Sequence, residues 1–228
     1  MERKFVDKFR NTFLSRLAMK IYSALELLAI KNFQTRKTMN LIGTIIKKDK
    51  PLLLPSELFL IYAFAQTQTL VAGDFAEVGV CRGGTAKVIC EAKQNKTLHL
   101  FDTFAGLPET EAIDHEVNFR SEMFAASLAE VKKQLAKYKN VRFYKGIFPQ
   151  TSTPARNKKF AFVHLDVDLY RGTKDCLQFF YPRMSRGGMI VSHDYDMRGV
   201  KKAFDEFFAD KREVVTQLAM TQALVVKR

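Results

Sequence analysis

The sequence predicts an α/β fold with a mostly parallel, doubly wound sheet, and three observations lead to this prediction. After Asp74, short apolar strands alternate with helical patterns, which is typical of a parallel sheet with helices on both faces. In the stretch FAEVGVCRGGTA, an apolar strand runs through an acidic residue into a glycine-rich turn that opens a helix. The 228 residues, of which 47% are hydrophobic, suffice for one large core and a helical extension.

The helical extension is expected over residues 1–70. Apolar residues recur every four positions from Phe5 to Ile21 and predict an amphipathic helix over residues 3–30. Further helices are expected at 35–47 and from 55 or 56 to 66. Residues 1–50 contain 12 basic and 4 acidic residues, and therefore carry +8 of the net charge of +13. Such an extension can dock as a lid, pack in a homo-oligomer, or lie on an anionic membrane surface.

The α/β domain itself is expected over residues 71–228. Its main strands are predicted at 75–80, 97–101, 141–145, 160–165 and 187–192. The helices between and after them are predicted at 84–93, 124–138, 171–182 and 198–209. The final segments, REVVTQL and TQALVVK, predict two short strands with a tight turn near Ala219 and Met220, and so an antiparallel hairpin at the sheet edge.

The cysteine pattern and the apolar runs bear on the compartment. Cys81, Cys90 and Cys176 show no C-x-x-C spacing and cannot all pair, which favours a reducing environment over a disulfide-stapled secreted domain. No apolar run reaches the length of about 18 residues that a membrane span needs. We therefore expect a cytoplasmic protein, with peripheral membrane contact through the N-terminal helix as the open alternative.

The glycine-rich turn favours a nucleotide-like ligand. Gly79, Gly83 and Gly84 have no side chain to block a close approach to the backbone, and the following helix presents unpaired N–H groups. The spacing is not G-x-G-x-x-G, so an ordinary dinucleotide site is not indicated, and a tight turn without a ligand remains the alternative. Asp102, 25 residues after Glu77, ends the next strand, where it can accept hydrogen bonds from ribose hydroxyls.

Polar or glycine residues follow all five predicted parallel strands. Ligands of open α/β sheets bind beyond the carboxyl ends of the strands, so these residues mark a candidate site. Asp166, His193 and Asp194 form an oxygen and nitrogen ligand set for a hard divalent cation such as Mg²⁺. Asp168 follows the same strand as Asp166. His164 lies inside that strand and is expected to be a hydrogen-bonded core residue.

Five segments together resemble one family. They are GDFAEVGVCRGGTA, LFDTFAGLPE, VRFYKGIFPQT, HLDVDLY and YPRMSRGGMIVSHDY. Over residues 73–196, and more loosely over the whole chain, the sequence resembles the macrocin O-methyltransferase-like enzymes. These are S-adenosylmethionine-dependent sugar O-methyltransferases with the class I Rossmann-like fold.

The resemblance implies roles for individual residues. The family's acidic metal ligand and proposed general base matches Asp166, and its paired carboxylates after the fifth strand match His193 and Asp194. The catalytic residues are thus Asp166 and Asp194, and the metal ligands are these two and His193. The first residue of the family's carboxylate pair is thus a histidine here. Because imidazole suits Mg²⁺ less well than oxygen does, both the identity of the metal, Mg²⁺ or Mn²⁺, and the dependence on a metal stay open. The implied S-adenosylmethionine contacts are Glu77, Gly79, Arg82, Gly83, Gly84, Asp102, Gly146 and Phe148, the last two in a turn near the adenine.

The function implied by the resemblance is methyl transfer to a sugar hydroxyl of a glycosylated metabolite or polysaccharide, assisted by a divalent metal. The acceptor is then a small molecule or a glycan. A nucleic-acid methyltransferase would explain the basic charge. However, the fourth strand ends in DVDLY and not in Asn/Asp-Pro-Pro-aromatic, and no Pro-Cys pair occurs. A non-catalytic S-adenosylmethionine-binding scaffold is the third class, against which the joint presence of the glycines, Asp102 and Asp166 argues.

Overall fold

The computed structural model describes residues 13–32, 34–49, 51–114 and 123–228. The chain divides into two compact units, residues 1–59 and residues 60–228. The division falls inside helix α4 (Pro55–Thr67), whereas the sequence places a boundary after residue 70. Pro55 suits the first position of a helix, and the carboxylate of Glu57 accepts a hydrogen bond from the Leu54 amide at 2.8 Å, which together fix where α4 begins.

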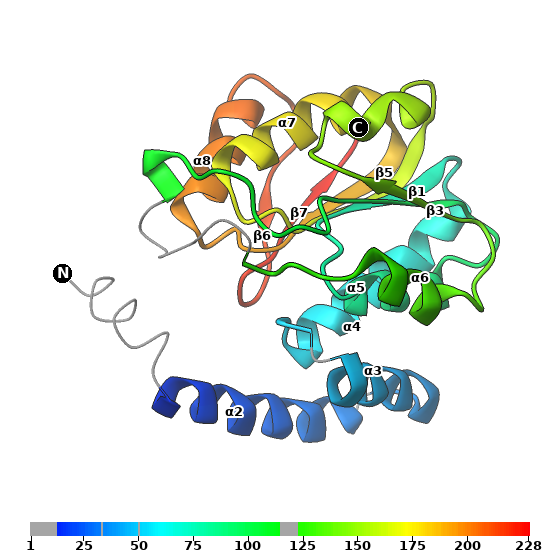
Figure 1. Cartoon of the computed structure of the whole chain (residues 1–228), viewed down its shortest axis with the longest axis vertical. Coiled ribbons are helices and arrows are strands. Elements are labelled where there is room, and N and C mark those ends of the chain that lie inside the picture. The colour runs from blue at the N-terminus through cyan, green and yellow to red at the C-terminus, as the bar shows by residue number, and fades with distance from the viewer. Residues whose placement is uncertain (1–12, 33, 50, 115–122) are drawn as a thin grey trace. The chain divides into compact units, whose positions relative to one another are not determined.

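The N-terminal unit is built on two helices, α2 (Phe13–Lys31) and α3 (Arg36–Asp49), which pack against each other (Figure 1). Helix α3 buries one face, which includes Ile42 and Ile45. The predicted helix over 3–30 is confirmed from residue 13 onward, and its first part lies outside the described residues. The other two predicted helices are present within a few residues of their expected bounds.

The second unit contains one seven-stranded sheet with the order β3-β2-β1-β4-β5-β7-β6. Five strands are parallel: β1 (Asp74–Val78), β2 (Leu98–Asp102), β3 (Val141–Lys145), β4 (Phe160–Leu165) and β5 (Met184–Ser192). The short hairpin of β6 (Thr216–Gln217) and β7 (Ala223–Val226) closes one side, with β7 antiparallel to β5. The predicted fold class and edge hairpin are confirmed. The strand order reverses between β1 and β4, the point at which such sheets bind ligands.

Helices cover both faces of the sheet (Figure 1). One face carries α5 (Gly84–Ala92) and α6 (Leu128–Leu135), and the other carries α7 (Tyr170–Phe180) and α8 (Arg198–Phe208). Helix α6 is shorter than the predicted 124–138. It begins after Ser127, whose hydroxyl accepts a hydrogen bond from the Glu130 amide, so a side-chain cap sets its start.

The core beneath α7 and α8 is rich in aromatic rings. Along β1, Ala76 and Val78 face this cluster, while Phe75 and Glu77 point to the opposite face, as the two-residue period of a strand requires. The ring of Phe180 packs edge-on against Phe160, with 5.0 Å between centroids. Burial of each such side chain contributes roughly 1.5–3 kcal/mol, so this cluster fixes the sheet whose carboxyl edge carries the site.

Candidate active site

The glycine-rich turn after β1 is held by the carboxylate of Asp102. Its Oδ2 accepts hydrogen bonds from the amides of Val80 and Cys81 at 2.7 and 2.8 Å, and its Oδ1 accepts one from the amide of Phe104. Gly83 caps α5 with a φ of +79°. Asp102 therefore lies at the turn, as the sequence predicts, and the structure adds that it shapes the turn.

Gly79 brings the turn into direct contact with Asp166, the residue that follows β4. Its φ is +87°, and a Cβ there would lie 2.6 Å from the carbonyl carbon of Asp166 and overlap the carbonyl oxygen. The Gly79 amide donates to Phe101 O at 3.0 Å, and the Asp166 amide donates to Val78 O at 2.9 Å. Only a glycine fits here, and the turn is thereby continuous with the residues that follow β4.

Glu77, expected among the cofactor contacts, is fully buried. Its Oε1 lies 3.0 Å from Nδ1 of His164, its partner in register on β4. Burial raises the pKa of Glu77, while the hydrogen bond and charge of His164 act in the opposite direction. In this structure the Glu77 side chain is closed off from solvent and is paired with β4. His164 is the hydrogen-bonded core residue that the sequence predicts.

The other residues expected to contact the cofactor differ in exposure and backbone conformation. Arg82 is exposed at the turn, and Gly84 is the first residue of α5. Near the third strand end, Gly146 has a φ of +134°. The half-buried ring of Phe148, expected near the cofactor, stacks on Phe180 at 5.4 Å between centroids and packs against the core. The exposed side chain of that turn, which the resemblance places near the adenine, is Ile147.

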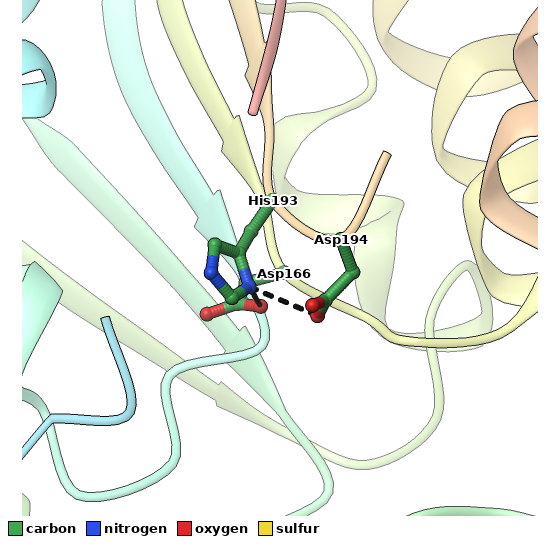
Figure 2. Close-up of side chains that lie close together, drawn as sticks. All are labelled: Asp166, His193 and Asp194. Atoms are coloured by element: carbon green, nitrogen blue, oxygen red, sulfur yellow. Dashed lines mark hydrogen bonds and ion pairs between the residues drawn. The ribbon is translucent and has the colours of Figure 1, made fainter. Parts of the chain in front are cut away.

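Asp166, His193 and Asp194 converge at the ends of β4 and β5 (Figure 2). Nδ1 of His193 lies 3.0 Å from Asp166 Oδ1 and 2.9 Å from Asp194 Oδ2. The backbone of Asp194 is left-handed, with a φ of +55°, which turns its carboxylate back toward the strand ends. The structure thus brings together the three residues that the sequence proposed as a ligand set.

The two carboxylates favour the charged form of His193. Burial by itself lowers its pKa, but the charges of Asp166 and Asp194 and their hydrogen bonds outweigh burial and hold the pKa well above the usual range. The imidazolium is therefore shared between two carboxylates. A mostly buried group whose pKa is shifted by specific charged partners, as His193 is, is typical of functional sites.

Asp168 completes the cluster; the sequence analysis places it after the same strand as Asp166 but assigns it no catalytic or metal-binding role. It is half-buried and left-handed, with a φ of +61°. Burial raises its pKa well above the usual range, and the nearby charges of Asp194 and Asp166 and a hydrogen bond with Asp194 raise it further. The signal was present in the sequence, since two carboxylates one residue apart follow a fully buried strand.

The donor set fits a single divalent cation. One ligand atom from each of Asp166, His193 and Asp194 can lie within 4.8 Å of the others. Two carboxylate oxygens with one imidazole nitrogen are a set that first-row divalent metals accept. Because a histidine must lose its ligating proton to bind a metal, a cation and the proton on His193 compete for this place.

The fold and the site together define a class, the class I methyltransferases. Among solved structures, the O-methyltransferase NovP matches with 27% identity and a TM-score of 0.68, over 78% of this chain and 81% of NovP. The calicheamicin methyltransferase CalS11 shares the fold, with 17% identity and a TM-score of 0.65, over 85% of this chain and 93% of CalS11. The model of the macrocin O-methyltransferase (TylF) family matches residues 63–226. The chain therefore belongs to that family.

Two curated relatives have nearly the same sequence identity to this chain. A tetracenomycin rhamnosyl 4'-O-methyltransferase of Streptomyces olivaceus is 30% identical over 152 residues, which are 60% of this chain and 58% of the relative. The mycinamicin III 3''-O-methyltransferase of Micromonospora griseorubida is 31% identical over 154 residues, 60% and 61% of the two chains. The matched part of the chain spans about three fifths of the length of these relatives.

Proposed function

We propose that this protein transfers the methyl group of S-adenosylmethionine to a sugar hydroxyl of a glycosylated metabolite or polysaccharide. The observation that carries the proposal is the packing of Gly79 on the carbonyl group of Asp166. It joins a cofactor-type glycine turn directly to a cluster of carboxylates, so a donor on the turn and an acceptor at the cluster would be neighbours. The names of the relatives, which are O-methyltransferases acting on rhamnosyl tetracenomycin and mycinamicin substrates, support a glycoside acceptor.

The cofactor would lie along the turn from Gly79 to Gly84. The first turn of α5 presents amide groups there, and Arg82 is exposed beside them. Asp102 would accept a ribose hydroxyl at Oδ1, because Oδ2 already accepts from two turn amides. The turn from Gly146 to Phe148 would border the adenine through its backbone and Ile147. These assignments rest on position at the sheet edge and on family membership.

The acceptor hydroxyl must be aligned with the sulfonium methyl group and must lose its proton. A sulfonium methyl is already electrophilic, so alignment and proton removal are what the protein has to supply. We assign proton removal to the carboxylate of Asp166, with Asp168 as the second candidate because its raised pKa favours proton uptake. Asp194 holds His193 in place on the other side of the cluster.

A divalent cation, Mg²⁺ or Mn²⁺, would be held by Asp166 and Asp194, with His193 as a third ligand once it is deprotonated. When bound, it would hold neighbouring sugar hydroxyls and lower the pKa of the one attacked. The protein's own groups would still set the geometry: β4 and β5 fix the two carboxylates, and the packing at Gly79 fixes their distance from the turn.

Two variants and one control test the proposal. Asp166→Asn and Asp168→Asn keep size while removing a basic oxygen, and Asp205→Asn is the control, because Asp205 lies on the outer side of α8 and pairs with Lys201. With S-adenosylmethionine and a panel of deoxysugar glycosides, we expect Asp166→Asn to bind cofactor normally and to lose ~10²-fold or more in turnover. The larger loss of the two identifies the base. Near-normal turnover of both variants would contradict the proposed role of the cluster.

A further inference from the structure

Helix α2 exposes an apolar stripe that the N-terminal unit does not use. The stripe consists of Leu17, Ile21, Leu25 and Leu28, whose exposed fractions run from 45% to 62%. Spacings of four, four and three residues place them on one face of the helix. The opposite face is engaged within the unit: Leu27 lies near Gly43 of α3, and Glu26 accepts a hydrogen bond from the Ser56 hydroxyl at 2.7 Å.

Cations surround this stripe. Lys20 and Lys31 are exposed, and each lies one helical turn from a leucine of the stripe. On α3, Arg36, Lys37, Lys47 and Lys48 are exposed as well. Among the described residues of the unit, the acidic side chains are half-buried or buried. Its surface is therefore strongly basic beside an exposed apolar stripe.

We propose that the stripe of α2 docks the protein on an anionic lipid bilayer. The leucines and Ile21 would enter the boundary between headgroups and acyl chains, and the long stems of Lys20 and Lys31 would let their ammonium groups reach the lipid phosphates. None of the helices in the described part of the chain is long and apolar enough to cross a membrane, so α2 would lie in the plane of the surface. A second copy fits less well, because pairing two such stripes would bring the two sets of cations together.

Vesicle flotation of the full chain tests this proposal. The vesicles are phosphatidylcholine alone, or phosphatidylcholine with phosphatidylglycerol. One variant, Ile21→Glu with Leu25→Glu, disrupts the stripe, and another, Lys20→Glu with Lys31→Glu, reverses the adjacent charge. The matched control is Leu70→Glu with Val214→Glu, which changes two apolar side chains of the second unit that are 89% and 66% exposed. Circular dichroism and thermal unfolding establish that each variant folds.

We expect binding to the anionic vesicles only. Raising ionic strength from ~0.1 to ~1 M, which shortens the screening length from about 10 to about 3 Å, should weaken binding. The charge variant should have a partition coefficient at least about tenfold lower than the wild type, roughly the effect of losing two cations. The stripe variant should not bind, and the control variant should bind like the wild type. Equal binding to neutral vesicles, or unchanged binding of the stripe variant, would overturn the proposal. Absence of vesicle binding would also overturn it. In that case, a change in the oligomeric state of the stripe variant, measured by light scattering, would identify a second copy of the chain as the occupant of the stripe.

Discussion

Replacing Gly79 with alanine tests how the cofactor turn is joined to the carboxylate cluster. An alanine at a φ of +87° costs roughly 1–2 kcal/mol in backbone strain. In addition, its Cβ would lie 2.6 Å from the carbonyl carbon of Asp166, whereas real Cβ contacts stay above 3.0 Å, so the ends of β1 and β4 must separate. Separation weakens the hydrogen bond from the Asp166 amide to Val78 O, and the displacement of Gly79 weakens the hydrogen bond from its amide to Phe101 O of β2. Each of these hydrogen bonds is worth about 0.5–1.5 kcal/mol net. The expected loss in the free energy of unfolding is therefore ~2–5 kcal/mol.

Gly187→Ala is the matched control for this substitution. Gly187 has a φ of +80°, but a Cβ there would meet nothing nearer than Val71 Cγ2 at 4.0 Å. It should lose only the strain of roughly 1–2 kcal/mol. Urea unfolding gives both losses, and calorimetry gives the affinity for S-adenosylmethionine, which should fall at least about tenfold in Gly79→Ala alone. Equal losses of stability in the two variants, with cofactor affinity unchanged in both, would refute the reasoning.

Three further predictions concern charged groups. Asp102→Ala removes the acceptor of two turn amides and the proposed ribose acceptor, so calorimetry should show cofactor affinity reduced ~10- to 100-fold; an unchanged affinity would contradict the assignment. Burial alone raises the pKa of Glu213, but hydrogen bonds from Lys227 and Tyr181 outweigh it and lower the pKa to about 2, below the usual 4.5. The stability this supplies is present above pH 4.5 and is lost as the pH falls toward 2. Urea unfolding should therefore show Glu213→Gln about 1–2 kcal/mol less stable than wild type near neutral pH, with the gap closing in acid, and a gap independent of pH would be the contrary result. Because the pKa of His193 is raised, Mn²⁺ affinity in calorimetric titrations should continue to increase with pH above the usual histidine pKa of about 6.5, and a flat profile would remove His193 from the ligand set.

The sheet could be predicted from the sequence because each parallel strand is short and has a glycine or a polar residue at or directly after its carboxyl end. The strands β3 and β4 have the predicted bounds. By contrast, β5 begins at Met184, three residues before the prediction, because the pairing of β4 with β5 is irregular between Phe160 and Phe162. Gly187, where the predicted strand begins, lies inside β5. Pairing of this kind depends on the neighbouring strand and is not written in the local sequence.

For the candidate site too, some features could be predicted from the sequence and others could not. The convergence of Asp166, His193 and Asp194 follows from the rule that parallel strands end at one edge of the sheet. Side-chain direction does not follow from that rule. Glu77 shares a face with Phe75 along a buried strand, so its alternation already indicated burial, whereas the stacking of Phe148 on Phe180 joins segments far apart in the sequence. Asp168 depends on a left-handed backbone that turns it toward Asp194.

The most direct test of the proposed activity is transfer of an isotopically labelled methyl group from S-adenosylmethionine to a glycoside, with the methylated atom located by nuclear magnetic resonance. We expect one labelled methyl group on a sugar oxygen, formed together with S-adenosylhomocysteine. Chelation with EDTA should stop transfer and Mg²⁺ or Mn²⁺ should restore it; full activity after chelation would remove the metal and leave a metal-free base mechanism. Label on a nitrogen, label in nucleic acid, or bound cofactor that no sugar acceptor converts would contradict the assignment of a sugar O-methyltransferase.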